Sequence, residues 1–302
     1  MSFPLIRYFK NSIGSHIRQY IPGTFENIKN RKRDILKKYI NKERSAGLYV
    51  SMTTFEPRLK VFEYTVLSIL AGTVLPEKIL IYVPRGFRNL VERNDDSWLK
   101  YELGKGLVEM IEMEVDLGCH SKYFYSFQHY GGSKDILICD DDVVYYENWL
   151  KDLLHAMRHR EYDVFAFKAV QVKVVNNTIQ PYDSWTHCSF RSRGENELLY
   201  AEGVGGVLYR KNSINKEVLN KDKFLELAPK ADDVWLWFCT YLNSCRIKYV
   251  VPTNTKKLLY VIPGSQETNL WVENTLNKRN DIFVEKCHTY FLEQYNLDLT
   301  RY

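Results

Sequence analysis

The pattern of hydrophobic and polar positions changes near residue 46. From Leu48 onward, short apolar runs alternate with segments in which apolar residues recur every three or four positions. The runs predict buried strands, and the spacing of three or four predicts amphipathic helices. Alternation of the two favours a parallel sheet with right-handed crossovers. We therefore predict an α/β domain over residues 46–302, with a mixed, mostly parallel sheet flanked by helices.

The predicted strands cover residues 48–52, 78–83, 108–115, 135–139, 163–169 and 258–262, and a further short strand ends at Tyr209. Predicted helices cover residues 59–70, 148–160 and 281–295, another runs from Trp235 through Leu242, and one more ends near Tyr130. Asn176 and Asn177 predict the turn of a hairpin between residues 170–175 and 178–180.

Three consecutive acids, Asp140, Asp141 and Asp142, directly follow the apolar strand 135–139. Adjacent carboxylates repel one another, so a fold that holds them at a buried strand end needs a cation or many hydrogen-bond donors. Ligands of open α/β sheets bind at that edge. The alternative is a solvated acidic turn that caps the helix beginning near Asn148. The buried strand before the triplet favours a metal or ligand site.

Thr53, Thr54 and Arg58 follow the first strand, so they are expected at the same edge as Asp140. An ordinary turn before a helix is the alternative, and it would leave Arg58 solvated. Lys122 stands at a helix start, where the helix dipole disfavours a cation, and this favours a role in binding an anion.

Glycines 203, 205 and 206 precede the strand that ends at Tyr209, and they would let backbone amides approach a ligand closely. A tight turn needs the same glycines. Asp232 and Asp233 precede an aromatic helix. One aspartate is sufficient to cap a helix, which leaves the second available for chemistry.

Four stretches, in this order along the chain, resemble bacterial glycosyltransferases with the Rossmann-like GT-A fold, similar to family 2, that synthesise surface polysaccharides such as O-antigen and lipopolysaccharide. The stretches are Tyr49–Thr54, Ile136–Tyr145, Gly203–Tyr209 and Ala231–Trp237. The resemblance covers roughly residues 47–290. No single motif is very specific, so the resemblance depends on the order of the four stretches. The second stretch resembles the DXD segment that delivers aspartates to a divalent metal and a nucleotide-sugar.

The resemblance implies a role for each candidate residue. Asp142, helped by Asp140, holds Mn²⁺ or Mg²⁺. The catalytic base is Asp233, with Asp232 as the alternative, because the relatives more often have Glu-Asp than Asp-Asp at this pair. The implied donor-binding residues are Thr53, Thr54, Arg58, Lys122, Asp140, Asp141, Gly205 and Gly206. Residues expected to line the acceptor cleft are Trp185, His187, Arg191 and Trp235.

The implied activity is metal-dependent transfer of a hexose from a nucleotide-diphosphate sugar, such as UDP-galactose or UDP-glucose, to a hydroxyl of a saccharide or lipid-linked saccharide. With a catalytic base the transfer inverts the anomeric carbon. A sugar nucleotidyltransferase is an alternative, but it should show a glycine-rich phosphate loop, and residues 51–58 contain no glycine. A non-catalytic carbohydrate-binding relative is another, and the intact acids argue against it.

Residues 1–45 differ from the rest in charge. They hold eleven Lys or Arg against three acids, a charge of +8, whereas the whole chain of 302 residues carries +5 and the remainder therefore −3. Apolar residues among these cations predict two amphipathic helices, separated at Pro22 and Gly23. They could bind an anionic membrane surface, or pack on the domain or a second copy. No nucleic-acid-reading motif accompanies the charge.

The six cysteines form no CxxC pair, and we expect reduced packing residues. The apolar stretch Phe3–Ile6 is too short for a signal peptide, and no run approaches 18 apolar residues. We expect a cytoplasmic protein, with any membrane contact at the inner face of the cell membrane through residues 1–45.

Overall fold

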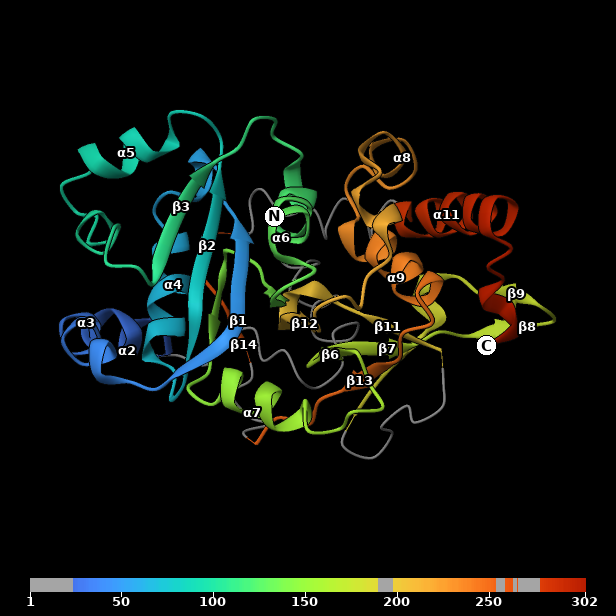
Figure 1. Ribbon diagram of the computed structural model, residues 1–302, viewed down its shortest axis with the longest axis horizontal. Helices are drawn as coiled ribbons and strands as arrows, with labels where there is room; N and C mark the ends of the chain where they lie inside the picture. The colour runs from blue at the N-terminus through green and yellow to red at the C-terminus, as the bar shows by residue number, and fades with distance from the viewer. Residues whose placement is uncertain (1–23, 190–197, 254–258, 263–264, 266–277) are drawn as a thin grey trace, which may run out of the picture.

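The structure is a computed structural model that describes residues 24–189, 198–253, 259–262, 265 and 278–302. A seven-stranded sheet lies at its centre, in the order β13-β6-β12-β4-β1-β2-β3 (Figure 1). Its strands are β1 (Arg44–Thr53), β2 (Leu75–Val83), β3 (Val108–Glu112), β4 (Asp135–Ile138), β6 (Val164–Ala166), β12 (Val207–Tyr209) and β13 (Ile247–Tyr249). Neighbouring strands are parallel, except that β12 runs antiparallel to β4 and β6. The predicted mixed, mostly parallel sheet is confirmed.

Smaller sheets extend from this one, in the orders β10-β7-β11, β14-β5 and β8-β9. Their strands are β5 (Val143–Tyr145), β7 (Ala169–Gln171), β8 (Val174–Val175), β9 (Thr178–Ile179), β10 (Thr186–His187), β11 (Leu199–Ala201) and β14 (Leu259–Val261). The hairpin prediction is confirmed: Asn176 and Asn177 join β8 and β9 with φ values of 51° and 55°, as a tight two-residue turn requires. The strand predicted over residues 163–169 is instead divided between two sheets.

The helices are α2 (Thr24–Asn30), α3 (Lys32–Lys38), α4 (Phe62–Ala71), α5 (Phe87–Arg93), α6 (Ser121–Tyr130), α7 (Trp149–Ala156), α8 (Lys221–Leu227), α9 (Asp232–Leu242) and α11 (Arg279–Tyr295). The pattern did not predict α5, α8 or β13. Helix α7 ends before the predicted Arg160, and Arg210 donates hydrogen bonds to the carbonyls of Met157 and Tyr162 just beyond its end.

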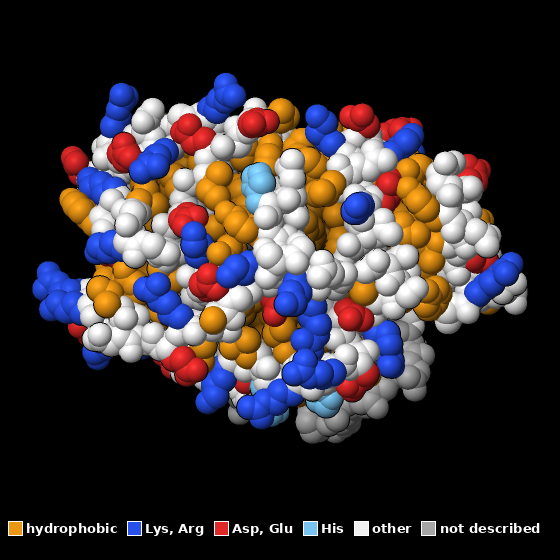
Figure 2. Space-filling model, viewed as in Figure 1, with side chains coloured by type: hydrophobic (Ala, Val, Ile, Leu, Met, Phe, Trp, Pro, Cys, Tyr) orange, Lys and Arg blue, Asp and Glu red, His pale blue; other side chains and the backbone are white. Residues whose placement is uncertain are grey.

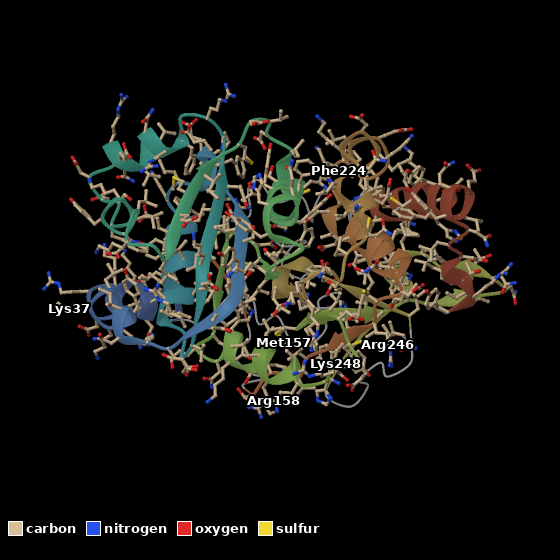
Figure 3. The ribbon with its side chains drawn as sticks, viewed as in Figure 1. Lys37, Met157, Arg158, Phe224, Arg246 and Lys248 are labelled. Atoms are coloured by element: carbon tan, nitrogen blue, oxygen red, sulfur yellow. The ribbon has the colours of Figure 1, made fainter. Side chains whose placement is uncertain are left out.

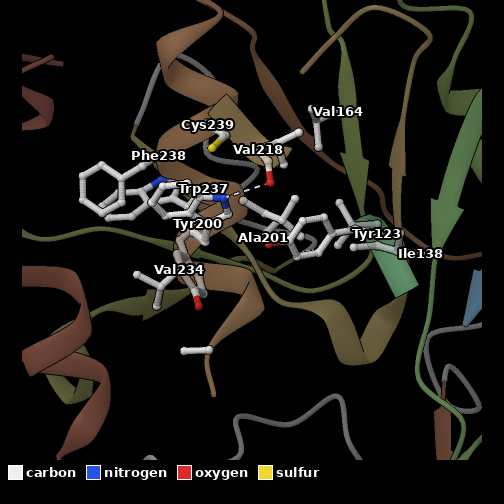
Figure 4. Packing of buried hydrophobic residues seen from close by; sticks show 14 of the residues in the cluster. Tyr123, Ile138, Val164, Tyr200, Ala201, Val218, Val234, Trp237, Phe238 and Cys239 are labelled. Atoms are coloured by element: carbon white, nitrogen blue, oxygen red, sulfur yellow. Dashed lines mark hydrogen bonds between the residues drawn. The ribbon is translucent and has the colours of Figure 1, made fainter. Parts of the chain in front are cut away.

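Alternate residues of β1 face opposite sides of the sheet, as the period of two requires. Leu48, Val50 and Met52 pack with α2, α3, α4 and α7, whereas Tyr49 packs with α6 and belongs to the core that includes α9 and α11. Figure 4 shows part of the core that contains Tyr49, α6, α9 and α11, at the place where Val234, Trp237 and other α9 residues pack with Tyr200. Both faces of the sheet are covered, which leaves its edges for function.

The basic N-terminal segment is packed on the domain wherever it is described. Ile28, Ile35 and Tyr39 are buried in the same core as α4. Cations of α2 and α3 are exposed, as Lys37 is at the left of Figure 3, and Figure 2 shows basic side chains at that end of the molecule among apolar and acidic ones. The packing alternative therefore fits residues 24–41. Residues 1–23, which contain the first predicted helix, lie outside the described residues.

Five of the six cysteines are buried, which agrees with the prediction that they are packing residues. None of the described helices combines the length and the apolar character needed to cross a membrane.

Candidate active site

The three consecutive acids lie at the carboxyl edge of the sheet, where β1 and β4 end side by side. Their backbone is fixed from several directions. The carbonyl of Asp142 accepts a hydrogen bond from Ile262 N at 2.9 Å, and that of Asp141 accepts one from Thr65 Oγ1 at 2.9 Å. Asp140 N donates to the Tyr145 hydroxyl at 3.1 Å. The triplet is therefore a built feature of the edge, and the solvated-turn alternative does not describe it.

Arg58 forms a buried ion pair with Asp142, with 2.7 Å between Nη1 and Oδ2 and side-chain exposures of only 7% and 13%. Burial and the neighbouring Asp140 raise the pKa of Asp142, and Arg58 opposes that rise. The structure thus excludes the alternative in which Arg58 is solvated. Its guanidinium lies where a negative ligand at this edge would meet it.

Asp141 lies between the two predicted metal ligands. Burial and the adjacent Asp142 raise its pKa to about 7, against the lowering effect of Arg58. Its Oδ2 atom is buried and makes no hydrogen bond among the described residues. A buried carboxylate oxygen without a donor favours a proton or a cation.

Lys122 joins the acids of the sheet edge to those of α9. Its Nζ atom lies 2.7 Å from Asp140 Oδ1 and 2.9 Å from Asp232 Oδ2, and the residue is 5% exposed. Burial alone would lower its pKa, but Asp140, Asp232 and Asp233 together raise it well above its ordinary value. Lys122 is therefore a cation that two carboxylates already share.

The two aspartates of α9 have different surroundings. The Asp232 side chain makes no capping hydrogen bond and pairs with Lys122 instead, so the helix-cap alternative does not describe it. Burial would raise the pKa of Asp232, but Lys122 holds it below its ordinary value. Burial and Asp232 raise the pKa of Asp233 well above its usual range. One member of the pair is thus a stabilised anion and the other a stronger base.

Gly203 is placed against Asp233. Its amide donates to Asp233 Oδ2 at 2.9 Å, and a Cβ atom at Gly203 would lie 2.7 Å from Asp233 Oδ1. A larger residue would displace the carboxylate, so glycine is needed here for close approach.

Trp149 packs against the other two glycines. Gly206 has φ +85°, and an added Cβ would lie 2.6 Å from the Trp149 ring; Trp149 Nε1 donates to Gly205 O at 2.9 Å. At Gly205 an added Cβ would meet Lys168 N at 3.1 Å. These contacts fit the tight-turn alternative, and the donor-binding role of Gly205 and Gly206 stays a prediction.

Thr53 is the last residue of β1, and Thr54 follows it at the same edge. Thr53 Oγ1 and Thr54 N both bind the carbonyl of Tyr82 on β2, at 3.0 and 3.1 Å. The edge therefore brings together Thr53, Thr54, Arg58 and the acid triplet, as the sequence predicted.

The predicted acceptor residues do not share one environment. Trp235 is fully buried, and its Nε1 atom donates to Val218 O at 3.2 Å, so it is a core residue and the acceptor role does not fit its position. Trp185 is 7% exposed among Tyr182, Tyr200 and Trp237. The side chain of His187 is 38% exposed. Arg191 lies outside the described residues.

Sequence reasoning missed a second group of charged residues, centred on Glu202, which directly precedes Gly203. Glu202 Oε2 lies 3.2 Å from Lys168 Nζ and 3.7 Å from His187 Nδ1, and Tyr182 Oη donates to Glu202 Oε1 at 2.9 Å. The position of Glu202 directly before the glycines is the one signal that could have found it.

A divalent cation fits the donor chemistry at this edge, since Asp140 and Asp142 present hard carboxylate oxygens. Within the described ranges, no group of three or more His, Cys, Asp or Glu side chains is arranged to hold a metal ion. Nucleotide-bound Mg²⁺ commonly takes only one or two carboxylates and completes its shell with phosphate oxygens and water. Asp140 and Asp142 would supply these two carboxylates, beside Asp141, whose buried Oδ2 atom has no hydrogen-bond partner among the described residues.

Neither a family model nor a curated protein sequence matches the chain. Among solved structures it is similar to S. aureus TarS 1-349 (TM-score 0.47, 14% identity, 82% of this chain and 73% of that one), of which another structure contains UDP-GlcNAc. It is also similar to the mannosyltransferase PcManGT from Pyrobaculum calidifontis in complex with GDP-Man and Mn²⁺ (0.47, 11%, 89% and 73%). A third is the inositol-1-phosphate CTP transferase from T. maritima (0.41, 14%, 80% and 96%). Because the TM-scores of these three structures are below 0.5, the roles of the site residues rest on this chain's own geometry.

Proposed function

We propose that the chain is a metal-dependent glycosyltransferase that moves a hexose from a nucleotide-diphosphate sugar to a hydroxyl of a saccharide or lipid-linked saccharide acceptor, with inversion. The observation that carries the proposal is the arrangement of charge at the carboxyl edge. Two buried cations, Arg58 and Lys122, lie among five aspartates, and Asp233, which lies in α9 away from the acid triplet, has a pKa raised well above its usual range.

The donor lies across the ends of β1 and β4. Arg58 and Lys122 orient its diphosphate, and Thr53 and Thr54 line the nucleotide side of the edge. A divalent cation held by Asp142 and Asp140 would supply further positive charge for the leaving diphosphate.

Asp233 acts as the general base. Its raised pKa makes it a stronger base than an exposed aspartate, and Asp232, paired with Lys122, remains an anion that helps to keep it so. As Asp233 takes the acceptor's hydroxyl proton, the oxygen attacks the anomeric carbon on the face opposite the leaving group. A single displacement of this kind inverts the configuration.

The proposal also includes peripheral contact with an anionic membrane through the N-terminal segment. Because Ile28, Ile35 and Tyr39 are buried, residues 24–41 can contribute exposed cations such as Lys37 and the exposed side chain of Ile40, but not a continuous apolar face. Apolar insertion would therefore depend mainly on residues 1–23.

The function is tested with a donor panel of UDP-glucose, UDP-galactose, UDP-GlcNAc and GDP-mannose, each with Mn²⁺ or Mg²⁺. We expect at least one donor to raise the melting temperature and to release its nucleoside diphosphate slowly, since ligands that bind only the folded state stabilise it. Absence of both effects for every donor and either metal would contradict the proposal.

A further inference from the structure

Glu202 and Lys168 are joined by two separate contacts. Their side chains form an ion pair of 3.2 Å with exposures of 13% and 11%, and Glu202 N donates to Lys168 O at 2.9 Å. Tyr182 Oη donates to the Glu202 carboxylate at 2.9 Å. Burial would raise the pKa of Glu202, but Lys168 and His187 hold it below its ordinary value. Residue 202 is therefore held firmly over residue 168.

The next residue, Gly203, directs its amide at Asp233 Oδ2 from 2.9 Å. The Gly203 N–H lies in the same rigid peptide plane as the Glu202 carbonyl, so its direction depends on how Glu202 is held. The far side of this turn is fixed independently, because Gly206 N donates to Gly203 O at 2.8 Å and Trp149 binds Gly205 O. The ion pair and the hydrogen bond from Glu202 N to Lys168 O together fix the near side.

We propose that Lys168 and Glu202 are positioning residues for Asp233: their ion pair holds the Glu202–Gly203 peptide so that the Gly203 amide binds the ionised Asp233 carboxylate. The inference rests on the proposed function, in which Asp233 is the base. Because the two charges nearly cancel, the electric field of the ion pair at Asp233 is weak. The pair therefore acts mainly by holding the Gly203 amide in position.

Other groups also interact electrostatically with Asp233. They are Asp232 of the same helix, Lys122 of α6, Asp140 after β4, and the hydroxyls of Tyr182, Tyr200 and Tyr209. Tyr182 also donates to Glu202, and Glu202→Gln keeps a side-chain oxygen that can accept that bond. A hydrogen bond donated to a carboxylate favours its ionised form. Loss of the Gly203 contact should therefore raise the pH at which Asp233 becomes able to accept a proton.

The test is the double variant Lys168→Met with Glu202→Gln, which removes both charges and leaves no buried ion unpaired. Lys134→Met with Glu77→Gln is the matched control. That ion pair, of 2.9 Å, lies at the opposite edge of the sheet, and Glu77 there also accepts a hydrogen bond from a glycine amide, Gly47 N. The readout, as a function of pH, is release of the nucleoside diphosphate from whichever of UDP-glucose, UDP-galactose, UDP-GlcNAc and GDP-mannose the unmodified chain uses.

We expect kcat of the double variant to fall about 10-fold near neutral pH, and the acid limb of its pH profile to move up by roughly one unit. The control should change neither. In an Asp233→Asn background, the same double substitution should cause no further loss, because it acts through Asp233. An equal loss in both backgrounds, or an unmoved acid limb, overturns the inference. Full activity of Asp233→Asn alone would instead refute the proposed function.

A measurement that needs no turnover gives an independent test. The amide resonance of Gly203 in the full chain should shift with pH as Asp233 titrates, and the shift should vanish in the Lys168→Met, Glu202→Gln variant. An amide that titrates equally in both proteins would overturn the inference.

Discussion

Replacing Lys122 by Met tests whether the buried charges form one network. The substitution keeps the length of the side chain but leaves Asp140 and Asp232 facing each other without the cation that lies 2.7 and 2.9 Å from them. Removing one partner from a buried ion pair costs about 3–5 kcal/mol. At roughly 2–3 °C per kcal/mol for a chain of this length, the melting temperature should fall by about 6–15 °C near neutral pH.

The loss should depend on pH. In the unmodified chain the pKa of Asp232 is depressed, so its stabilising contribution is present at neutral pH and is lost as the pH falls through that pKa. Without Lys122, burial raises the pKa of Asp232, and the folded variant then becomes less stable as the pH rises through the raised value. The gap in melting temperature should therefore be widest near pH 8 and narrow towards pH 5.

Thermal melting across this pH range is the assay. Lys134→Met is the control, because solvent screens its ion pair with Glu77, whose side chains are 26% and 33% exposed, and its loss should change the melting temperature little. A small, pH-independent change for Lys122→Met, equal to that of the control, would refute the network.

Two further predictions concern the metal and the basic N-terminal segment, residues 1–45. Asp142→Ala should abolish transfer in Mn²⁺ and weaken donor binding, whereas the exposed Asp116→Ala should not; undiminished activity of the unmodified chain in excess chelator would disprove metal dependence. Deleting residues 1–23 should release the chain from anionic vesicles without lowering its melting temperature, whereas deleting residues 1–45 should also destabilise it, because Ile28, Ile35 and Tyr39 leave the core. Equal vesicle binding by the full chain and the 1–23 deletion would contradict the membrane contact.

The sequence predicted the elements whose signal is local. Strand β4 was found because its apolar run is unbroken, and the turn at Asn176 and Asn177 because few other residues adopt its dihedral angles. Order along the chain also placed Arg58 and Asp140 at one edge, because the ends of parallel strands meet there. Strand β13 was missed because Ile247–Tyr249 gives only three residues of pattern.

The environment of each charge could not be predicted, because it depends on contacts between distant segments. Asp232 looked like a helix cap, and only the fold brings Lys122 from α6 to compete for it. Trp235 was predicted to line the acceptor cleft, but sequence alone cannot distinguish a tryptophan that contacts a ligand from one that packs in a core. The packing of α9 buries this side chain. Lys168 gives no local signal at all, and its role depends on Glu202, 34 positions later in the chain.

Transfer by Asp233→Asn, compared with Asp232→Asn, tests the central claim most directly. Asparagine preserves the shape of Asp233 but cannot accept the acceptor's proton, so transfer should fall on the order of 10²–10⁴-fold while donor affinity barely changes. Asp232→Asn should be milder in activity, and the sugar in the product should have the inverted anomeric configuration. An active Asp233→Asn variant, or a product that retains the configuration of the donor, would contradict the mechanism.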